Sequence, residues 1–275
     1  PAMLATMAVT GVLRGFQDTR TPLIVTVITF SLNLVLNLWF VLGMGWGIEG
    51  SAIGTLICQI AMAVALVWVL WRRTHGLDLS LVPHWGGIAS SLRDGIPLLI
   101  RTLALRAALY VTTWVAARAG AITMAAYQVT MTIWNLLLMT MDALGIAGQA
   151  LTGASLGAGD IRRTRLLTGT MIRWGAWAGV VIGALLAASH QLVPAIYTND
   201  PAVHRAVAAG LLVVAVEQVI AGPAFVLDGV LIGAGDGRWL SRAQVVMFLV
   251  YLPMAWAVHL WAPADPAAAV VWLWI

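Results

Sequence analysis

The chain has 275 residues, of which 61% are hydrophobic and only 9% are charged, with a formal net charge of +4. About a quarter of the residues of a soluble globular domain are charged, so this composition excludes that class. The basic excess does not require a nucleic-acid partner. If residues 14–21 face the cytoplasm, ten of the arginines near the ends of apolar stretches share that side, and only Arg118 and Arg205 fall on the other. Such an asymmetry is the positive-inside bias of membrane proteins.

Seven apolar stretches each reach the ~20 residues that a helix needs to cross a bilayer. They are, in chain order, 22–43, 50–71, 94–117, 121–152, 164–188, 203–232 and 239–262. Stretches of this length without alternation of period two predict helices rather than a transmembrane barrel. The predicted fold class is therefore an all-α integral membrane protein, with partial spans at 1–13 and 266–275.

The first of these helices carries a polar seam. Thr26, Thr29, Asn33 and Asn37 follow one another at helical spacing on 22–43, so they share a face of an apolar span. We expect Asn33 and Asn37 either to line a cavity or to join neighbouring helices by hydrogen bonds. The next candidate is Arg101 in 94–117, which would line a transport path if the substrate or a neighbouring side chain is anionic. Arg106 would instead pair with a buried carboxylate.

A second polar stripe runs along 121–152, where four side chains recur every seven residues. These are Gln128, Asn135, Asp142 and Gln149. Seven residues turn an α-helix to within ~20° of the starting direction, so the four share one face. A carboxylate at this depth needs a cation, a proton or several donors, which makes Asp142 a candidate for ion coupling or for pairing with an arginine. Trp134 lies beside the stripe and could contact an aromatic substrate.

The helix 203–232 holds two further carboxylates, Glu217 and Asp228, eleven residues apart and therefore on one face. Asp228 could alternatively cap the loop that follows. Pro223 lies between them, removes one helical hydrogen bond and is expected to act as a kink or hinge. We expect Asp142, Asp228, Glu217 and Arg101 to serve ion coupling or substrate binding, with Gln128, Asn135, Gln149, Trp134, Asn33 and Asn37 lining the cavity.

A decapeptide occurs twice: GVLRGFQDTR at 11–20 returns as GVLIGAGDGR at 229–238. Six helices separate the two copies, so both have the same orientation, as in parallel repeats of transporters. This predicts two six-helix bundles related by a pseudo-two-fold axis, in a chain truncated at both ends. The predicted organisation is 1–71 as the C-terminal half of the N-lobe, 72–93 as a cytoplasmic linker and 94–275 as the C-lobe. We expect Asp18 to cap the helix that follows the first copy.

Four segments together resemble the multidrug and toxic compound extrusion (MATE) family, in its DinF-like branch. They read GVLRGFQDTRTPL, RTLALRAALYVTTWVAARAG, AAYQVTMTIWNLLLMTMDALGIAGQALTGASLGAGD and FVLDGVLIGAGD. The resemblance runs from helix four to the start of helix twelve and implies a V-shaped pair of bundles. Sodium-coupled members carry an acidic residue where this chain has Ala221, and a glutamate in the helix that here carries Arg101 and Arg106. These departures speak against that cation site.

The resemblance implies a secondary-active antiporter that exports organic solutes or drugs by alternating access, in exchange for protons or sodium ions. We expect it in the cytoplasmic (inner) membrane of a bacterium, as a monomer whose partners are a small organic substrate and the lipid bilayer. No cofactor, metal site, nucleic-acid partner or enzymatic activity is expected, since no phosphate-binding loop, HExxH or nucleophile elbow occurs. Two alternatives stay open: a flippase of lipid-linked oligosaccharides, and an exporter of citrate-like organic anions.

Overall fold

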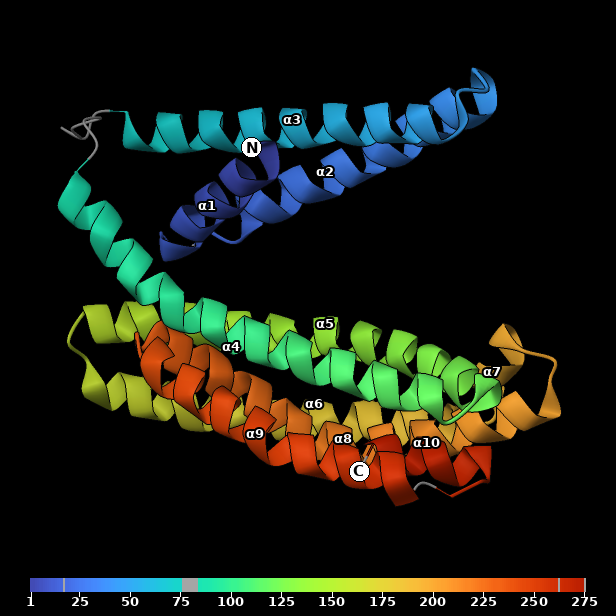
Figure 1. Cartoon of the computed structure of the whole chain (residues 1–275). Helices are drawn as coiled ribbons and strands as arrows, with labels where there is room; N and C mark the ends of the chain where they lie inside the picture. The colour runs from blue at the N-terminus through green and yellow to red at the C-terminus, as the bar shows by residue number, and fades with distance from the viewer. Residues whose placement is uncertain (17, 76–83, 262, 275) are drawn as a thin grey trace. The chain divides into compact units, whose positions relative to one another are not determined.

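The computed structural model describes residues 1–16, 18–75, 84–261 and 263–274, and the elements in these ranges are all helices (Figure 1). They separate into two compact units, Pro1–Pro83 and His84–Ile275. The first unit contains α1 (Ala2–Gly15), α2 (Arg20–Asn37), a π-helical continuation η1 (Leu38–Gly43) and α3 (Gly47–Thr74). The second contains α4 (Trp85–Arg118), α5 (Ala121–Gly157), α6 (Ile161–Ser189), α7 (Leu192–Tyr197), α8 (Pro201–Gly233), α9 (Gly237–Trp261) and α10 (Pro266–Trp274).

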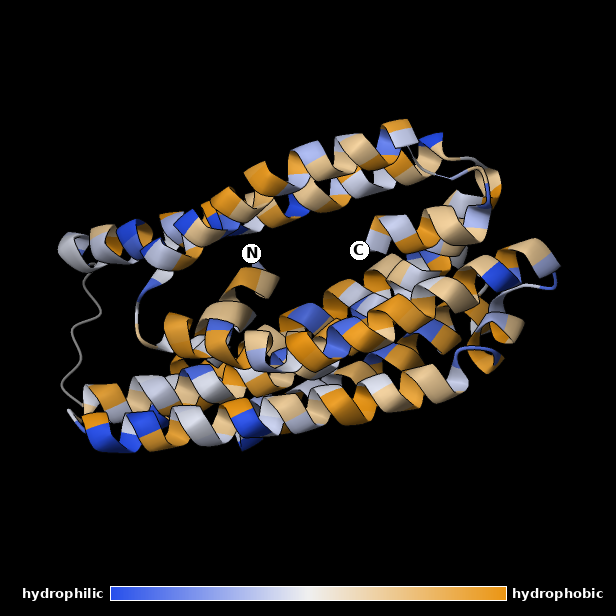
Figure 2. Cartoon of the chain, turned by 90° about the horizontal axis from the view of Figure 1, so that it is seen from below, coloured by the Kyte–Doolittle hydropathy of each residue, from blue (hydrophilic) through white to orange (hydrophobic). Residues whose placement is uncertain are grey.

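Seven helices in the described ranges are long and apolar enough to cross a membrane, which confirms the seven predicted spans. Hydrophobic residues cover most of their length, and Figure 2 shows them on outward-facing turns as well as between the helices. Their outer faces carry large exposed apolar side chains such as Leu42, Ile48 and Leu185. Exposing so much apolar surface to water would be unfavourable, whereas contact with lipid tails is not.

The predicted linker 72–93 is shorter in the structure. Helix α3 continues to Thr74 and α4 already begins at Trp85, while residues 76–83 lie outside the described residues. The start of α4 is capped by His84, whose Nδ1 accepts the Gly87 N–H at 3.2 Å. Hydropathy marks only the part of a helix that crosses hydrocarbon, so it predicts a loop where the polar first turns of α4 lie. The assignment of the two units to the two lobes of a repeat stays a prediction.

Helix α8 occupies the centre of the second unit, between α5 and α6. The contact with α6 depends on Gly175, because a Cβ there would lie 2.6 Å from the carbonyl oxygen of Gly222. On the other side, a Cβ on Gly229 would overlap the carbonyl of Gly145 in α5. Close backbone approach through small residues is how membrane helices gain packing energy without a hydrophobic driving force. These glycines therefore fix which faces of α5 and α6 point inward.

The two copies of the repeated decapeptide have the same local structure. The N–H of Asp18 bonds to the carbonyl of Leu13 at 2.9 Å, and that of Asp236 to the carbonyl of Leu231 at 3.0 Å. Each bond closes the end of a helix by the same turn. The Asp18 carboxylate then accepts the N–H and hydroxyl of Thr21, at 3.0 and 2.7 Å, which confirms the predicted cap of α2. Asp236 accepts the backbone N–H of the third residue after it in the same way.

Asp18 also binds α3, since Arg73 donates to its carboxylate at 2.6 Å. The two donors of Thr21 lower the pKa of Asp18 most, and the Arg73 charge lowers it further. The carboxylate is itself nearly covered, with 8% of its side chain exposed. The repeated loop is thus an architectural joint, and in the first unit it holds the ends of α1, α2 and α3 together.

Candidate functional site

The predicted polar stripe lies on the outward face of α5. Gln128, Asn135, Asp142 and Gln149 are all exposed, whereas the residues that α5 buries against its neighbours include Thr130, Met141, Gly145 and Gly148. Asn135 donates to the carbonyl of Met131 on its own helix at 2.8 Å. Within the described part of the second unit, the stripe makes no hydrogen bond to another helix. Of the two readings left open by the sequence, interhelical bonding is therefore not what these amides do in this unit.

An ion pair joins α4 to α8. The guanidinium of Arg101 donates to the carboxylate of Asp228 at 2.6 Å, and about a quarter of each side chain is exposed, 24% and 27%. The neighbour that Arg101 was expected to need is thus Asp228. Asp228 does not cap the loop, because Asp236 makes that contact. The expected ion pair of Arg106 with a buried carboxylate is not formed either. Arg106 is exposed and has no carboxylate within 4.0 Å among the described residues.

Asp142 completes a charged group with this pair. It lies on the exposed face of α5, three residues before Gly145, which meets the residue next to Asp228. The register of the helices explains this proximity, since α5 and α8 run in the same direction and Gly145 touches Gly229. The three side chains carry two negative charges and one positive charge when all are ionised. The structure therefore brings together three of the four residues predicted for ion coupling or substrate binding.

The fourth, Glu217, lies elsewhere on α8. It is partly buried, and its Oε1 accepts the indole N–H of Trp134 at 3.4 Å. Its Oε2 is buried and has no hydrogen-bond partner within the described residues. Trp134 also packs against Trp274 of α10, with ring centroids 6.1 Å apart. Trp134 thus contacts Glu217 and Trp274 within the helix bundle, and these contacts occupy its indole N–H and one side of its ring.

Pro223 lies inside α8, between the levels of Glu217 and Asp228. The helix continues across it without interruption from Pro201 to Gly233. A proline cannot donate to the carbonyl four residues earlier, so the carbonyl of Val219 has no helical partner. Gly222, next to the proline, is the residue that touches α6 most closely. The hinge role of Pro223 stays a prediction, but its position separates the two carboxylate sites of α8.

In the first unit, the amide seam joins two helices. The Nδ2 of Asn33 donates to Thr55 of α3 at 3.3 Å, and the Nδ2 of Asn37 donates to Asn33 at 3.0 Å. Beside this seam, α1, α2 and α3 enclose a cavity of about 190 Å³. Its lining is mixed, since Asn33, Thr55 and Gln59 lie among Met, Phe and Cys side chains. For Asn33 both readings hold together, since its amide bonds to α3 and borders the cavity, whereas Asn37 bonds to Asn33 on its own helix and is not part of the cavity lining.

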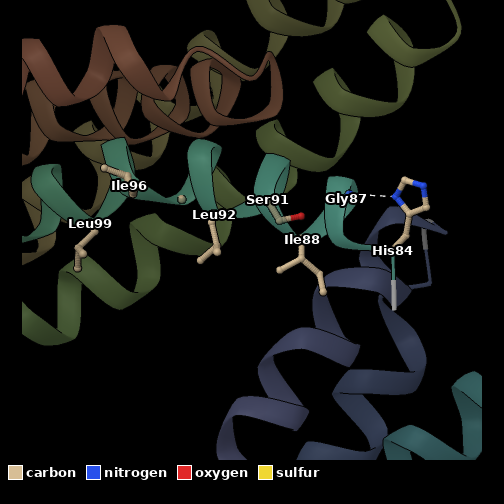
Figure 3. A pocket seen from close by; sticks show the side chains of 8 residues that line it. His84, Gly87, Ile88, Ser91, Leu92, Ile96 and Leu99 are labelled. Atoms are coloured by element: carbon tan, nitrogen blue, oxygen red, sulfur yellow. Dashed lines mark hydrogen bonds between the residues drawn. The ribbon is translucent and has the colours of Figure 1, made fainter. Parts of the chain in front are cut away.

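A larger hollow lies on the first turns of α4 and contains none of the predicted site residues. Figure 3 shows its lining side chains, which all come from the segment between His84 and Leu99. The lining is apolar except for Ser91 and His84. Because the side chains follow one helix, this is an open face rather than an enclosed site.

Sequence reasoning missed several partners of the predicted residues. Thr55 lies four residues from both Ser51 and Gln59, a helical spacing that could have indicated a second polar seam. Gln218 was also missed, although it is only 2% exposed. The Oε1 of Gln218 has no partner among the described residues. The position of Gln218, next to a glutamate in an apolar span, was the one available signal.

Seven membrane-length helices, with carboxylates and an ion pair held between them, define a multi-pass α-helical membrane protein. Residues 97–257, more than half of the chain, match the MatE family, and the chain belongs to that family. Protein DETOXIFICATION 43 of Arabidopsis thaliana is 31% identical over 247 residues, which cover 89% of this chain and 46% of that protein. DNA damage-inducible protein F of Escherichia coli (strain K12) is 25% identical over 250 residues, covering 90% and 54%.

The fold agrees with this membership. A crystal structure of a MATE in complex with MaL6 superposes with a TM-score of 0.87 at 19% identity, covering 100% of this chain and 63% of that one. The MATE resemblance seen in the sequence is thereby confirmed, and the similarity to DNA damage-inducible protein F fits the DinF-like branch. The chain spans about half the length of the curated relatives it matches.

Proposed function

We propose that this chain is part of a secondary-active antiporter that exports an organic solute across the cytoplasmic membrane of a bacterium. Protons, or alternatively sodium ions, would move inward by alternating access. The protein would act as a monomer in the lipid bilayer, and it would transport the solute and the coupling ion. Membership of a family whose relatives include multidrug resistance and toxin extrusion proteins supports solute efflux as the general activity.

The observation that carries the proposal is the environment of Glu217. One carboxylate oxygen is held by Trp134, and the other is buried without a donor in the described part of the protein. A carboxyl group in this state is completed either by a proton of its own or by a bound cation. Protons and sodium ions are both coupling ions of antiporters, and either could bind to this carboxylate and leave it again without another protein side chain. Glu217 is therefore the residue we assign to ion coupling.

The outward stripe of α5 and the charged group beside it support a solute path. An amide and carboxylate stripe about 32 Å long would be costly against lipid, so it is expected to face a polar cavity. In this reading Gln128, Asn135, Asp142 and Gln149 line the path, and the pair of Arg101 with Asp228 lies at its side. Pro223, between the two carboxylate levels, would let α8 bend when the protein changes state.

The two alternatives rested on the arginines of α4: the anion exporter on Arg101, and the flippase on Arg101 and Arg106. An exporter of organic anions was favoured by a free Arg101, but Asp228 offsets its charge. A flippase of lipid-linked oligosaccharides would need a cationic cavity, whereas the polar stripe of α5 carries one carboxylate and no arginine. The choice between protons and sodium ions rests on experiment.

The test uses the full-length protein in proteoliposomes with ethidium, an organic cation, as the transported probe. Ethidium movement is measured under an imposed pH gradient and, separately, under an imposed sodium gradient. We expect the pH gradient to drive transport and Glu217→Gln to abolish the dependence on that gradient, because the amide can neither take up a proton nor bind a cation by charge. Glu49→Gln, which neutralises an exposed glutamate in the first turn of α3, is the matched control.

Three outcomes would contradict the assignment. Gradient-driven ethidium transport at the wild-type rate in Glu217→Gln would remove Glu217 from coupling. Transport of citrate but not ethidium would favour the anion exporter, and lack of any response to either ion gradient would argue against an antiporter.

A further inference from the structure

Helix α6 has an outward face that the transport proposal does not use. Its inward face is set by Gly175, Gly179 and Gly183, which lie against α8. By helix geometry Trp177 lies opposite this face, with Trp174 and Arg173 on either side of it. The two tryptophans are 69% and 66% exposed, and Arg173 is exposed as well. Together with Thr170 these side chains border an open hollow on the surface of the helix.

Arg173 lies unusually deep for a charged side chain on an outward face. It is twelve residues after Ile161, which places its Cα about 18 Å along the helix axis. Its Nη2 lies 3.4 Å from the hydroxyl of Thr170, so the guanidinium turns back toward the N-terminal end of α6. Side chains on a helix lean in this direction, and an arginine in a membrane uses it to bring its charge to the headgroup level.

The charge on this helix is unbalanced. Besides Arg173, α6 carries Arg162, Arg163 and Arg165 in its first turns, has no acidic residue of its own, and is capped by the single carboxylate of Asp160. The salt bridges in the described ranges join other arginines, Arg73 and Arg101, to their carboxylates. Arg162 is eleven residues before Arg173 and therefore points within ~20° of it. A positively charged strip thus runs from the start of α6 into the apolar part of the helix, with two aromatic rings at its inner end.

We propose that the outward face of α6 binds an anionic phospholipid. The lipid phosphate accepts hydrogen bonds from the forked guanidinium of Arg173, and an acyl chain lies over Trp177. Arginine forms paired hydrogen bonds with phosphate, and tryptophan presents both an apolar ring and an N–H at the membrane interface. Three more arginines at the headgroup level favour an anionic lipid over a zwitterionic one.

A second copy of this chain fits the same face less well. A symmetric dimer places identical patches against each other. It would bring the arginines of one α6 against those of the other inside the membrane, where no carboxylate of this helix offsets them. A lipid headgroup supplies the missing negative charge.

The experiment measures quenching of tryptophan fluorescence by dibrominated lipids in the full-length protein. The protein is reconstituted in phosphatidylcholine with increasing fractions of dibrominated phosphatidylglycerol, and the relative affinity is read from the quenching curve. The signal from this face is the part lost in Trp177→Phe. We expect Arg173→Gln to weaken the relative affinity about fivefold, because each arginine near an anionic leaflet contributes an attraction of that order. Arg205→Gln, at the exposed start of α8, is the control and should leave it unchanged.

Arg173→Lys keeps the positive charge but loses the paired N–H groups of the guanidinium, so we expect an intermediate lipid affinity. If Arg173→Gln does not yield monodisperse protein, the proposal is tested with Arg173→Lys. Wild-type affinity in both Arg173 variants would overturn the proposal. Equal quenching by dibrominated phosphatidylcholine would overturn the preference for an anionic lipid. A change of oligomeric state in Trp177→Phe without a change in lipid quenching would assign the face to a second copy of the chain instead.

Discussion

The pair of Arg101 and Asp228 gives the sharpest test of the structure. At 2.6 Å the gross attraction of two unit charges is about 6 kcal/mol with an effective dielectric constant of ~20. Desolvation of the two groups offsets much of this, so the pair is close to neutral compared with an uncharged replacement. Removing one partner is different, since it leaves the other charge in the bundle alone. With about a quarter of each side chain exposed, we expect each single neutralisation to destabilise the protein by about 2 to 3 kcal/mol.

The double variant tells a formed pair from two independent side chains. Arg101→Gln with Asp228→Asn leaves two amides, and we expect it to be destabilised by less than ~1 kcal/mol, which corresponds to a coupling of about 3 kcal/mol or more. The four proteins are compared by unfolding of the full-length protein with SDS in mixed micelles. Arg106→Gln, on the same helix and without a carboxylate within 4.0 Å in the described ranges, should change stability by less than ~0.5 kcal/mol.

Additive effects of the two single variants, each below ~0.5 kcal/mol, would refute the ion pair between α4 and α8. Transport by the same four proteins adds a second readout. If Asp228 takes part in ion coupling, the double variant recovers stability but not ethidium transport. Recovery of both would make the pair a structural contact only.

Two further predictions concern stability. Gly175→Ala should destabilise the full-length protein by ~2 kcal/mol, because its Cβ would meet backbone atoms of α8. The control Gly169→Ala, whose Cβ would have nothing within 4 Å, should be neutral or stabilising. Equal effects of the two variants in a thermal unfolding assay would contradict the crossing of α6 with α8. Asp18→Asn should cost about 1 kcal/mol at pH 7. Since Thr21 and Arg73 lower the pKa of Asp18, its contribution is complete above its unfolded pKa and is lost as the pH falls through the lower folded value. The difference between wild type and variant should therefore shrink below about pH 4, and a difference that grows in acid would contradict this sign.

The sequence was sufficient for the features that follow from hydropathy or from helix geometry within one span. Runs of apolar residues predicted the seven spans, because the cost of exposing backbone polar groups to lipid leaves only helices of a fixed minimum length. The cap at Asp18 was predictable because it joins residues three apart. The sevenfold spacing of the α5 stripe placed its members on one face by helix geometry alone, and the structure keeps them there.

Only the tertiary structure decided which charged groups meet. Arg101 and Asp228 are 127 residues apart, and Glu217 and Trp134 are 83 apart, so no spacing rule connects them. The contact of Glu217 with Trp134 follows from the crossing of α8 with α5, which the close approach of Gly145 to Gly229 determines. Arg101 reaches Asp228 from α4, which packs mainly against α9. Hydropathy indicates how much of a helix lies in lipid. The partner of a polar side chain depends instead on which helices pack against its own helix, and on which of their faces are in contact. For this reason the polar residues of the candidate site could be predicted from the sequence, whereas their partners are determined by the helix packing.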